Sequence, residues 1–211
     1  MYKTLIYDFD GTIGDTLPIC IAAFRKAVTP FLNREITDGE IVSTFGPSEE
    51  GTIHALIPDH FDDGIHAYWT AYKELQYMAP KPFDGIRELL DDSAKAGFHN
   101  VLVTGKALTS AEISLEQYGL TTDFKLILTG SPKGPNKPEN IVKALKETNT
   151  TPDEALYIGD APSDITSSHA ANVKIAAALW GSVIEPEKVA ALKPDYTCHS
   201  VAEFRQIVLP N

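Results

Sequence analysis

The sequence predicts an α/β fold in which a Rossmann-like parallel sheet carries helices on both faces and a small all-helical cap is inserted after the first strand. Three observations predict it. A short apolar run of strand-favouring residues is formed by Leu5, Ile6, Tyr7 and Phe9, and residues 16–79 carry only helical patterns. Beyond that segment, short apolar strands alternate with helices, which is typical of a parallel sheet. We therefore expect a Rossmann-like core from residues 1–15 and 80–211, with residues 16–79 as the cap.

The expected cap begins with a helix whose apolar residues recur every three or four positions. Asp15 or Thr16 is suited to its start, and Pro18 is tolerated in its first turn. Further cap helices are expected at about 37–46, 48–57 and 62–77, before Pro80-Lys81-Pro82 interrupts the chain. The aromatic residues of the last of these helices, Tyr68, Trp69 and Tyr72, are expected to pack within the cap.

The core is expected to alternate between helices and buried strands. Gly97 is a suitable stop for the first core helix, and Pro138 a suitable residue for the start of a later one. We expect, in order, helix 85–97, strand 100–104, helix 106–119, strand 126–128, helix 138–148, strand 155–158, helix 162–171, strand 173–177 and helix 201–208.

Composition limits the partners and the compartment. The 211 residues are 43% hydrophobic and 22% charged, which is typical of a globular protein with a substantial core. A net charge of −11 argues against nucleic acid or an anionic membrane as the main partner. We see no signal peptide, and Cys20 and Cys198 form no Cys-x-x-Cys pair, which favours a reducing cytoplasm. The sequence leaves open whether the protein is a monomer or a dimer.

Polar residues with the chemistry of a phosphate site follow several of the predicted strands. Ligands of open α/β sheets bind outside the carboxyl ends of the strands. Four acids, one hydroxyl and one lysine are expected there: Asp8, Asp10, Thr104, Lys137, Asp160 and Asp164. Strand alternation lets Asp8 and Asp10 point to the same side. Mg²⁺ prefers such oxygen ligands, and a lysine neutralises a transferring phosphoryl group, so the set predicts magnesium-dependent phosphoryl transfer.

Four motifs in this order resemble those of the haloacid dehalogenase superfamily. The first is Asp8-Phe9-Asp10-Gly11-Thr12, and the second is an apolar strand that ends in Thr104-Gly105-Lys106. Lys137-Pro138 resembles the third motif, and Gly159-Asp160-Ala161-Pro162-Ser163-Asp164 the fourth. Leu179-Trp180-Gly181 also resembles a stretch of the phosphoglycolate phosphatase-like branch. The resemblance spans nearly the whole chain.

The resemblance implies a role for each candidate residue. Asp8 would be the nucleophile and a metal ligand, and Asp10 the general acid and base with its backbone carbonyl on the metal. Asp160 would complete the Mg²⁺ site, with Asp164 as a further ligand or a supporting acid. Thr104 and Gly105 would hold the substrate phosphate.

Lys137 would bridge the phosphate and the nucleophile, and Lys133 is the alternative for this role. We prefer Lys137 because Pro138 puts it beside a positive helix end.

The implied activity is hydrolysis of a small phosphorylated metabolite, a phosphoglycolate-like phosphomonoester, through an aspartyl-phosphate. A β-phosphoglucomutase-like phosphomutase, a pyrophosphatase, a nucleotide or sugar phosphatase, and a non-catalytic binding protein are the alternatives. Asp10 argues against the dehalogenases, which lack a carboxylate at this position. The phosphonate-cleaving branch needs a cap lysine, and neither Lys26 nor Lys73 has a recognisable context for it. Residues 44–49 are either a substrate-facing cap loop or a simple turn between helices.

Overall fold

A six-stranded parallel sheet forms the centre of the molecule in the computed structural model, which describes residues 1–209. Its strand order is β3-β2-β1-β4-β5-β6, and every neighbouring pair is parallel. The strands are β1 (Thr4–Tyr7), β2 (His99–Val103), β3 (Leu126–Leu128), β4 (Ala155–Gly159), β5 (Lys174–Ala178) and β6 (Tyr196–Cys198). The predicted α/β fold class is confirmed.

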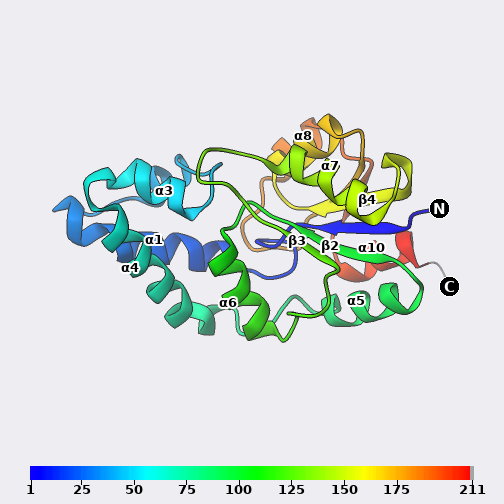
Figure 1. Ribbon diagram of the computed structural model, residues 1–211, viewed down its shortest axis with the longest axis horizontal. Helices are drawn as coiled ribbons and strands as arrows, with labels where there is room; N and C mark the ends of the chain where they lie inside the picture. The colour runs from blue at the N-terminus through cyan, green and yellow to red at the C-terminus, as the bar shows by residue number, and fades with distance from the viewer. Residues whose placement is uncertain (210–211) are drawn as a thin grey trace.

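Helices cover both faces of the sheet, as the alternation of strand side chains requires (Figure 1). In β1, Leu5 and Tyr7 point to one face, whereas Ile6 points to the other. The first face is covered by α5 (Ile86–Lys95), α6 (Leu108–Tyr118) and α10 (Val201–Val208). The second is covered by α7 (Lys137–Thr148), α8 (Pro162–Ala170) and α9 (Pro186–Ala191), and a short 3₁₀ turn, η3 (Pro152–Glu154), precedes β4.

An all-helical insert lies between β1 and α5 and extends away from the sheet (Figure 1). It comprises α1 (Leu17–Leu32), α2 (Asp38–Val42), α3 (Glu49–Leu56), η1 (Pro58–His60), α4 (Phe61–Glu74) and η2 (Leu75–Met78). The insert has a hydrophobic core of its own, in which Phe24, Tyr68 and Tyr72 are buried. Trp69 is only half-buried at its edge. The helical insert expected after the first strand is therefore present.

Two C-terminal elements, α9 and β6, were not expected from the sequence. β6 has only three residues and pairs with β5 alone, so it is too short to produce an alternating pattern. The first strand is also shorter than its apolar run, because β1 ends at Tyr7. Asp8 and Asp10 therefore lie in the loop beyond the strand.

The position of β1 determines where a ligand can bind. β1 lies between β2 and β4, and the chain order along the sheet reverses between these neighbours. Such a reversal leaves a crevice at the carboxyl ends of the two strands concerned. The residues that follow β1 and β4 are thus brought together by topology alone.

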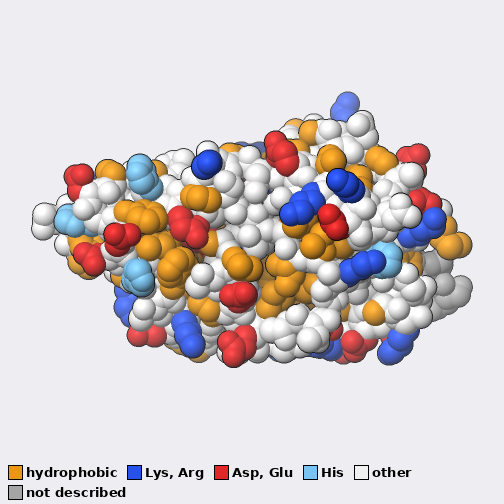
Figure 2. Space-filling view, in the orientation of Figure 1, with side chains coloured by type: hydrophobic (Ala, Val, Ile, Leu, Met, Phe, Trp, Pro, Cys, Tyr) orange, Lys and Arg blue, Asp and Glu red, His pale blue; other side chains and the backbone are white. Residues whose placement is uncertain are grey.

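Acidic and basic side chains are interspersed on the face seen in Figure 2, and no broad basic area forms on it. Hydrophobic side chains lie both on the part of this face that the insert forms and over its middle. Within residues 1–209, no helix combines the length and the apolar character needed to cross a bilayer.

A buried hydrogen bond joins the insert to the core, and its removal should destabilise the protein. Tyr72 Oη in α4 and Ser114 Oγ in α6 are 2.7 Å apart. Tyr72→Phe leaves the buried Ser114 hydroxyl unpaired, so we expect the free energy of unfolding to fall by about 1–3 kcal/mol. Adding Ser114→Ala should recover part of this loss, and Tyr77→Phe at an exposed tyrosine should change nothing. Urea unfolding curves measure all of these differences.

Candidate active site

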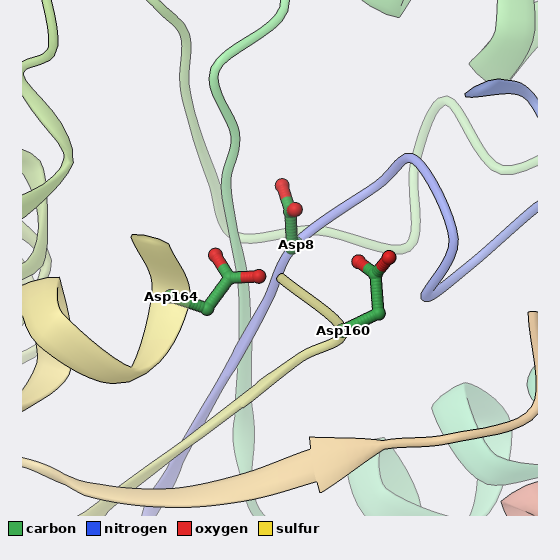
Figure 3. A group of neighbouring side chains, drawn as sticks. All are labelled: Asp8, Asp160 and Asp164. Atoms are coloured by element: carbon green, nitrogen blue, oxygen red, sulfur yellow. The ribbon is translucent and has the colours of Figure 1, made fainter. Parts of the chain in front are cut away.

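Three acidic side chains converge at the carboxyl end of β1 and β4 (Figure 3). Asp8 follows β1, Asp160 follows β4, and Asp164 lies in the first turn of α8. One carboxylate oxygen from each lies within 4.8 Å of the others. The strand-end rule predicted this convergence, and the geometry agrees with it.

The local backbone explains why these acids come so close. The amide of Asp8 donates to the carbonyl of Ile158 over 2.9 Å, which aligns the ends of β1 and β4. Gly11, with φ of +78°, then turns the loop past Asp160. A Cβ atom at Gly11 would overlap the carboxylate of Asp160, so this approach requires glycine.

The charges of these acids are not balanced by the protein. Asp8 is 6% exposed, and its Oδ1 has no hydrogen-bond partner within the described residues. Burial raises the pKa of Asp8 from 3.8 to about 7, opposed by Lys137 and reinforced by Asp164. Burial, together with Asp164 and Asp8, also raises the pKa of Asp160 well above its usual value. A buried, unpaired carboxylate oxygen is unfavourable, so the group fits a divalent cation with oxygen ligands.

Asp164 differs from the other two acids because its oxygens are already engaged. Oδ2 accepts a hydrogen bond of 2.9 Å from the amide of Ala161. Oδ1 accepts one of 3.1 Å from Tyr157 Oη and one from Lys137 Nζ. These contacts suit a residue that orients Lys137. They favour this role of Asp164 over direct binding of the metal.

Lys137, and not Lys133, reaches the acids. Lys137 is the first residue of α7, and its Nζ lies 3.3 Å from Asp8 Oδ2 and in contact with Asp164. These two carboxylates outweigh burial and raise the pKa of Lys137 above its usual value, so the side chain is charged. Lys133 is exposed in the preceding loop. Of the two lysines left open by the sequence, the structure brings only Lys137 to Asp8.

Thr104 and Gly105 stand at the end of β2, next to Asp8 in the sheet. Thr104 is buried, and its Oγ1 accepts a hydrogen bond of 3.2 Å from the amide of Lys106. Both residues line the same cavity as Asp8 and Lys137. Their predicted contact with a substrate phosphate is compatible with this placement.

Asp10 lines the cavity but does not join the acidic group. Its carboxylate accepts hydrogen bonds from Thr16 Oγ1 and from Lys106 Nζ, the latter at 3.0 and 3.2 Å. Thr16 is the residue before α1 and makes no side-chain cap of that helix, because its hydroxyl binds Asp10 instead. A metal contact through the carboxylate of Asp10 does not follow from this arrangement, whereas one through its backbone carbonyl stays a prediction.

Sequence reasoning missed two site residues, Lys106 and Glu49. Lys106 is 3% exposed, and its Nζ contacts Asp10 and lies 3.8 Å from Glu49 Oε1. Glu49 is 6% exposed and opens α3 of the insert. Lys106 stands within the second motif and Glu49 in the segment 44–49, but neither pattern reveals that the two meet.

The cavity above the acids has a volume of about 340 Å³. Its floor is formed by strand-end residues of the core, and its walls by apolar residues of the insert, namely Leu17, Phe24, Phe45, Pro47 and Tyr68. Segment 44–49 therefore faces the cavity, as one of the two interpretations of this stretch predicted. Within the described chain, Lys106 and Lys137 are the only basic side chains that line it.

The motifs, the fold and this site together point to one family. Residues 5–178 match the model of the haloacid dehalogenase-like hydrolases. The chain belongs to this family. The resemblance inferred from the motifs, and the expectation of an enzyme of this superfamily, are thereby confirmed.

Two relatives of this haloacid dehalogenase-like hydrolase carry different names. A pyrophosphatase PpaX of Bacillus pumilus is 29% identical over 208 residues, which cover 98% of this chain and 96% of the relative. A phosphoglycolate phosphatase of Aquifex aeolicus is 26% identical and covers 92% of this chain and 91% of its own.

Among solved structures, a mutant of CbbY from Rhodobacter sphaeroides, in complex with xylulose-(1,5)-bisphosphate, superposes with a TM-score of 0.82 at 17% identity and 96% coverage of both chains. The haloacid dehalogenase-like protein SP0104 of Streptococcus pneumoniae gives 0.79 at 24% identity and 98% coverage of both chains. At these identities, the structural matches establish the shared fold.

A divalent cation should stabilise the protein in a pH-dependent way. Because the pKa of Asp8 is raised from 3.8 to about 7, the folded state binds its proton more tightly than the unfolded state. The free energy of unfolding of the metal-free protein therefore falls as the pH rises from about 4 to about 7, because the folded state loses this proton. Excess Mg²⁺ binds the deprotonated form, so it should raise Tm more at about pH 8 than at about pH 5.

Thermal unfolding with excess Mg²⁺ or with chelator measures this difference. Asp160→Asn should remove the gain in Tm, whereas Asp153→Asn at an exposed acid should retain it. An equal gain in Tm at both pH values would contradict the cation site described here.

Proposed function

We propose that this hydrolase is a Mg²⁺-dependent phosphatase that cleaves a small phosphomonoester through an aspartyl-phosphate intermediate. The observation that carries the proposal is the environment of Asp8. One of its oxygens lacks a partner within residues 1–209 and the other lies 3.3 Å from Lys137, at the floor of a cavity. A carboxylate held in this way is suited to nucleophilic attack on a phosphoryl group.

The chain's own residues account for both half-reactions. In the first, an oxygen of Asp8 forms a bond to phosphorus while the bond to the leaving oxygen breaks, and Asp10 donates a proton to that oxygen. In the second, water attacks phosphorus, Asp10 accepts its proton, and Asp8 is released with inorganic phosphate. Lys137 and the Thr104 hydroxyl hold the phosphoryl oxygens throughout.

Asp8, Asp160 and the backbone carbonyl of Asp10 would hold Mg²⁺, with Asp164 in contact with Lys137. When bound, the ion supplies positive charge that balances the acids and the phosphoryl oxygens.

Residues 16–79 act in this proposal as a cap over a core of residues 1–15 and 80–211. The insert supplies the apolar walls of the cavity, among them Phe24 and Phe45. Such walls exclude bulk water, which strengthens the electrostatic interactions at the phosphoryl group. The leaving group of the substrate would lie between the strand ends and these walls.

The substrate we propose is phosphoglycolate or a closely similar small phosphomonoester. The relative from Aquifex aeolicus named phosphoglycolate phosphatase supports this choice. Pyrophosphate is the second candidate, because the relative from Bacillus pumilus is named a pyrophosphatase and is slightly more similar at 29% identity. We place the enzyme in the cytoplasm, where its two buried cysteines would stay reduced.

Removal of the nucleophile provides the direct test. Asp8→Asn should lower phosphate release by at least about 10³-fold, because an amide does not attack phosphorus, while the fold is retained. A phosphate-release assay with Mg²⁺ measures the rate, and Asp153→Asn at an exposed acid serves as the control. Turnover by Asp8→Asn near the wild-type rate would rule out the aspartyl-phosphate route, and full activity in excess chelator would rule out the metal.

A substrate panel separates the candidates. The wild-type enzyme with Mg²⁺ is assayed on phosphoglycolate, pyrophosphate, a nucleoside monophosphate and hexose phosphates, both for free phosphate and for isomerised sugar phosphate. We expect the highest kcat/KM for phosphoglycolate. A preference for pyrophosphate would transfer the assignment to the second candidate, and isomerisation without phosphate release would identify a phosphomutase.

A further inference from the structure

Lys106 is a buried lysine that lines the same cavity as Lys137. It follows Thr104 by two residues, and its side chain is 1% exposed. Its Nζ lies 3.0 and 3.2 Å from the two carboxylate oxygens of Asp10, 3.4 Å from Cys20 Sγ and 4.5 Å from the ring centre of Tyr72. An ammonium group is removed from water only where carboxylates replace its hydration.

Glu49 fixes the position of this lysine from the side of the insert. Its carboxylate accepts hydrogen bonds from the amide of Ala107 and from Ser110 Oγ, at the start of α6. Oε1 also lies 3.8 Å from Lys106 Nζ. Glu49 thus binds both the lysine and the backbone segment that carries it, so Lys106 has little freedom to move away from Asp10.

We propose that Lys106 is a positioning residue that holds Asp10 in place as the general acid and that Glu49 keeps Lys106 there. The inference rests on the proposed function, in which Asp10 protonates the leaving oxygen. As the bond from phosphorus to this oxygen breaks, the proton passes from Asp10 to the oxygen and Asp10 becomes a carboxylate. Lys106 keeps all its protons and stabilises the negative charge that develops on Asp10.

The contacts favour this role over direct binding of an anionic substrate group by Lys106. Both oxygens of Asp10 lie within hydrogen-bond distance of Nζ, and Glu49 stands on another side. An anionic leaving group would have to displace one of these carboxylates. The two roles differ in their kinetic consequences, because a general acid matters only when the leaving oxygen needs a proton.

The test compares leaving groups in Lys106→Met. A nitrophenolate leaves without protonation, whereas an alkoxide requires it, so only alkyl phosphates depend on a well-placed acid. We expect kcat/KM for an alkyl phosphate such as glycerol phosphate to fall by at least about tenfold, and kcat/KM for p-nitrophenyl phosphate by less than about threefold. The parameter kcat/KM isolates the half-reaction in which the leaving group departs.

Two further variants control the experiment. Lys143→Met removes an exposed lysine of α7 and should leave both substrates unaffected. Glu49→Gln should reproduce the selective loss on the alkyl phosphate at a smaller magnitude, and it decides the question if Lys106→Met does not fold, as judged by circular dichroism. The wild-type enzyme must release phosphate from p-nitrophenyl phosphate; if it does not, the proposed function fails rather than this inference.

Three outcomes would overturn the positioning role. Equal losses on both substrates would indicate a merely structural lysine. A loss of kcat/KM on phosphoglycolate, whose leaving group is anionic, without a loss on glycerol phosphate would indicate that Lys106 binds the leaving group directly. Unchanged kcat/KM on both substrates in a folded Lys106→Met would show that Asp10 is held by other groups.

Discussion

The buried contact between Lys137 and two carboxylates, Asp8 and Asp164, is the interaction on which the site depends. Separately, each of these groups would be strongly unfavourable in the interior. Together with Asp160 they still leave more negative than positive charge in a small volume. Burial raises the pKa of Asp8 and Asp164 reinforces the shift, and Asp8 Oδ1 has no hydrogen-bond partner within residues 1–209. The fold therefore maintains a group of acids that could hold a divalent cation.

The sheet makes this concentration of charge possible. Because the order of strands reverses beside β1, the loops after β1 and β4 meet over an open crevice rather than over a helix. Gly11 lets one loop pass directly across Asp160, where any side chain would collide. The hydrogen bond from Tyr157 to Asp164 extends from the buried face of β4 and fixes the acid that orients Lys137. The packing of the core thus helps to fix the geometry of the site.

The sequence could predict the half of the site that the sheet controls. Asp8, Thr104 and Asp160 directly follow strands, so the rule that ligands bind at strand ends was sufficient to bring them together. The choice between Lys137 and Lys133 rested on Pro138 alone in the sequence, whereas in the structure the contacts of Lys137 with Asp8 and Asp164 decide it. β6 was not predicted because three residues are too few to show the alternating pattern of a strand.

The other half of the site could not be predicted, since it depends on how the insert sits against the core. Glu49 and Ala107 are hydrogen-bonded although 58 positions separate them, and no spacing within either segment indicates this contact. Likewise, the apolar run to Phe9 suggested that alternation continues through Asp8 and Asp10, whereas β1 ends at Tyr7. Asp10 is then free to turn toward Lys106 while Asp8 faces Lys137.

The two lysines of the cavity are held in place by different parts of the structure. Lys137 is held by Asp8 and Asp164, which belong to the sheet and its helices. Lys106 is held partly by the insert, through Glu49 and the ring of Tyr72. A movement of the insert would therefore disturb the surroundings of Asp10 and leave those of Asp8 intact. In the phosphoryl transfer proposed above, the insert would therefore bear more directly on the proton transfer by Asp10 than on the attack by Asp8.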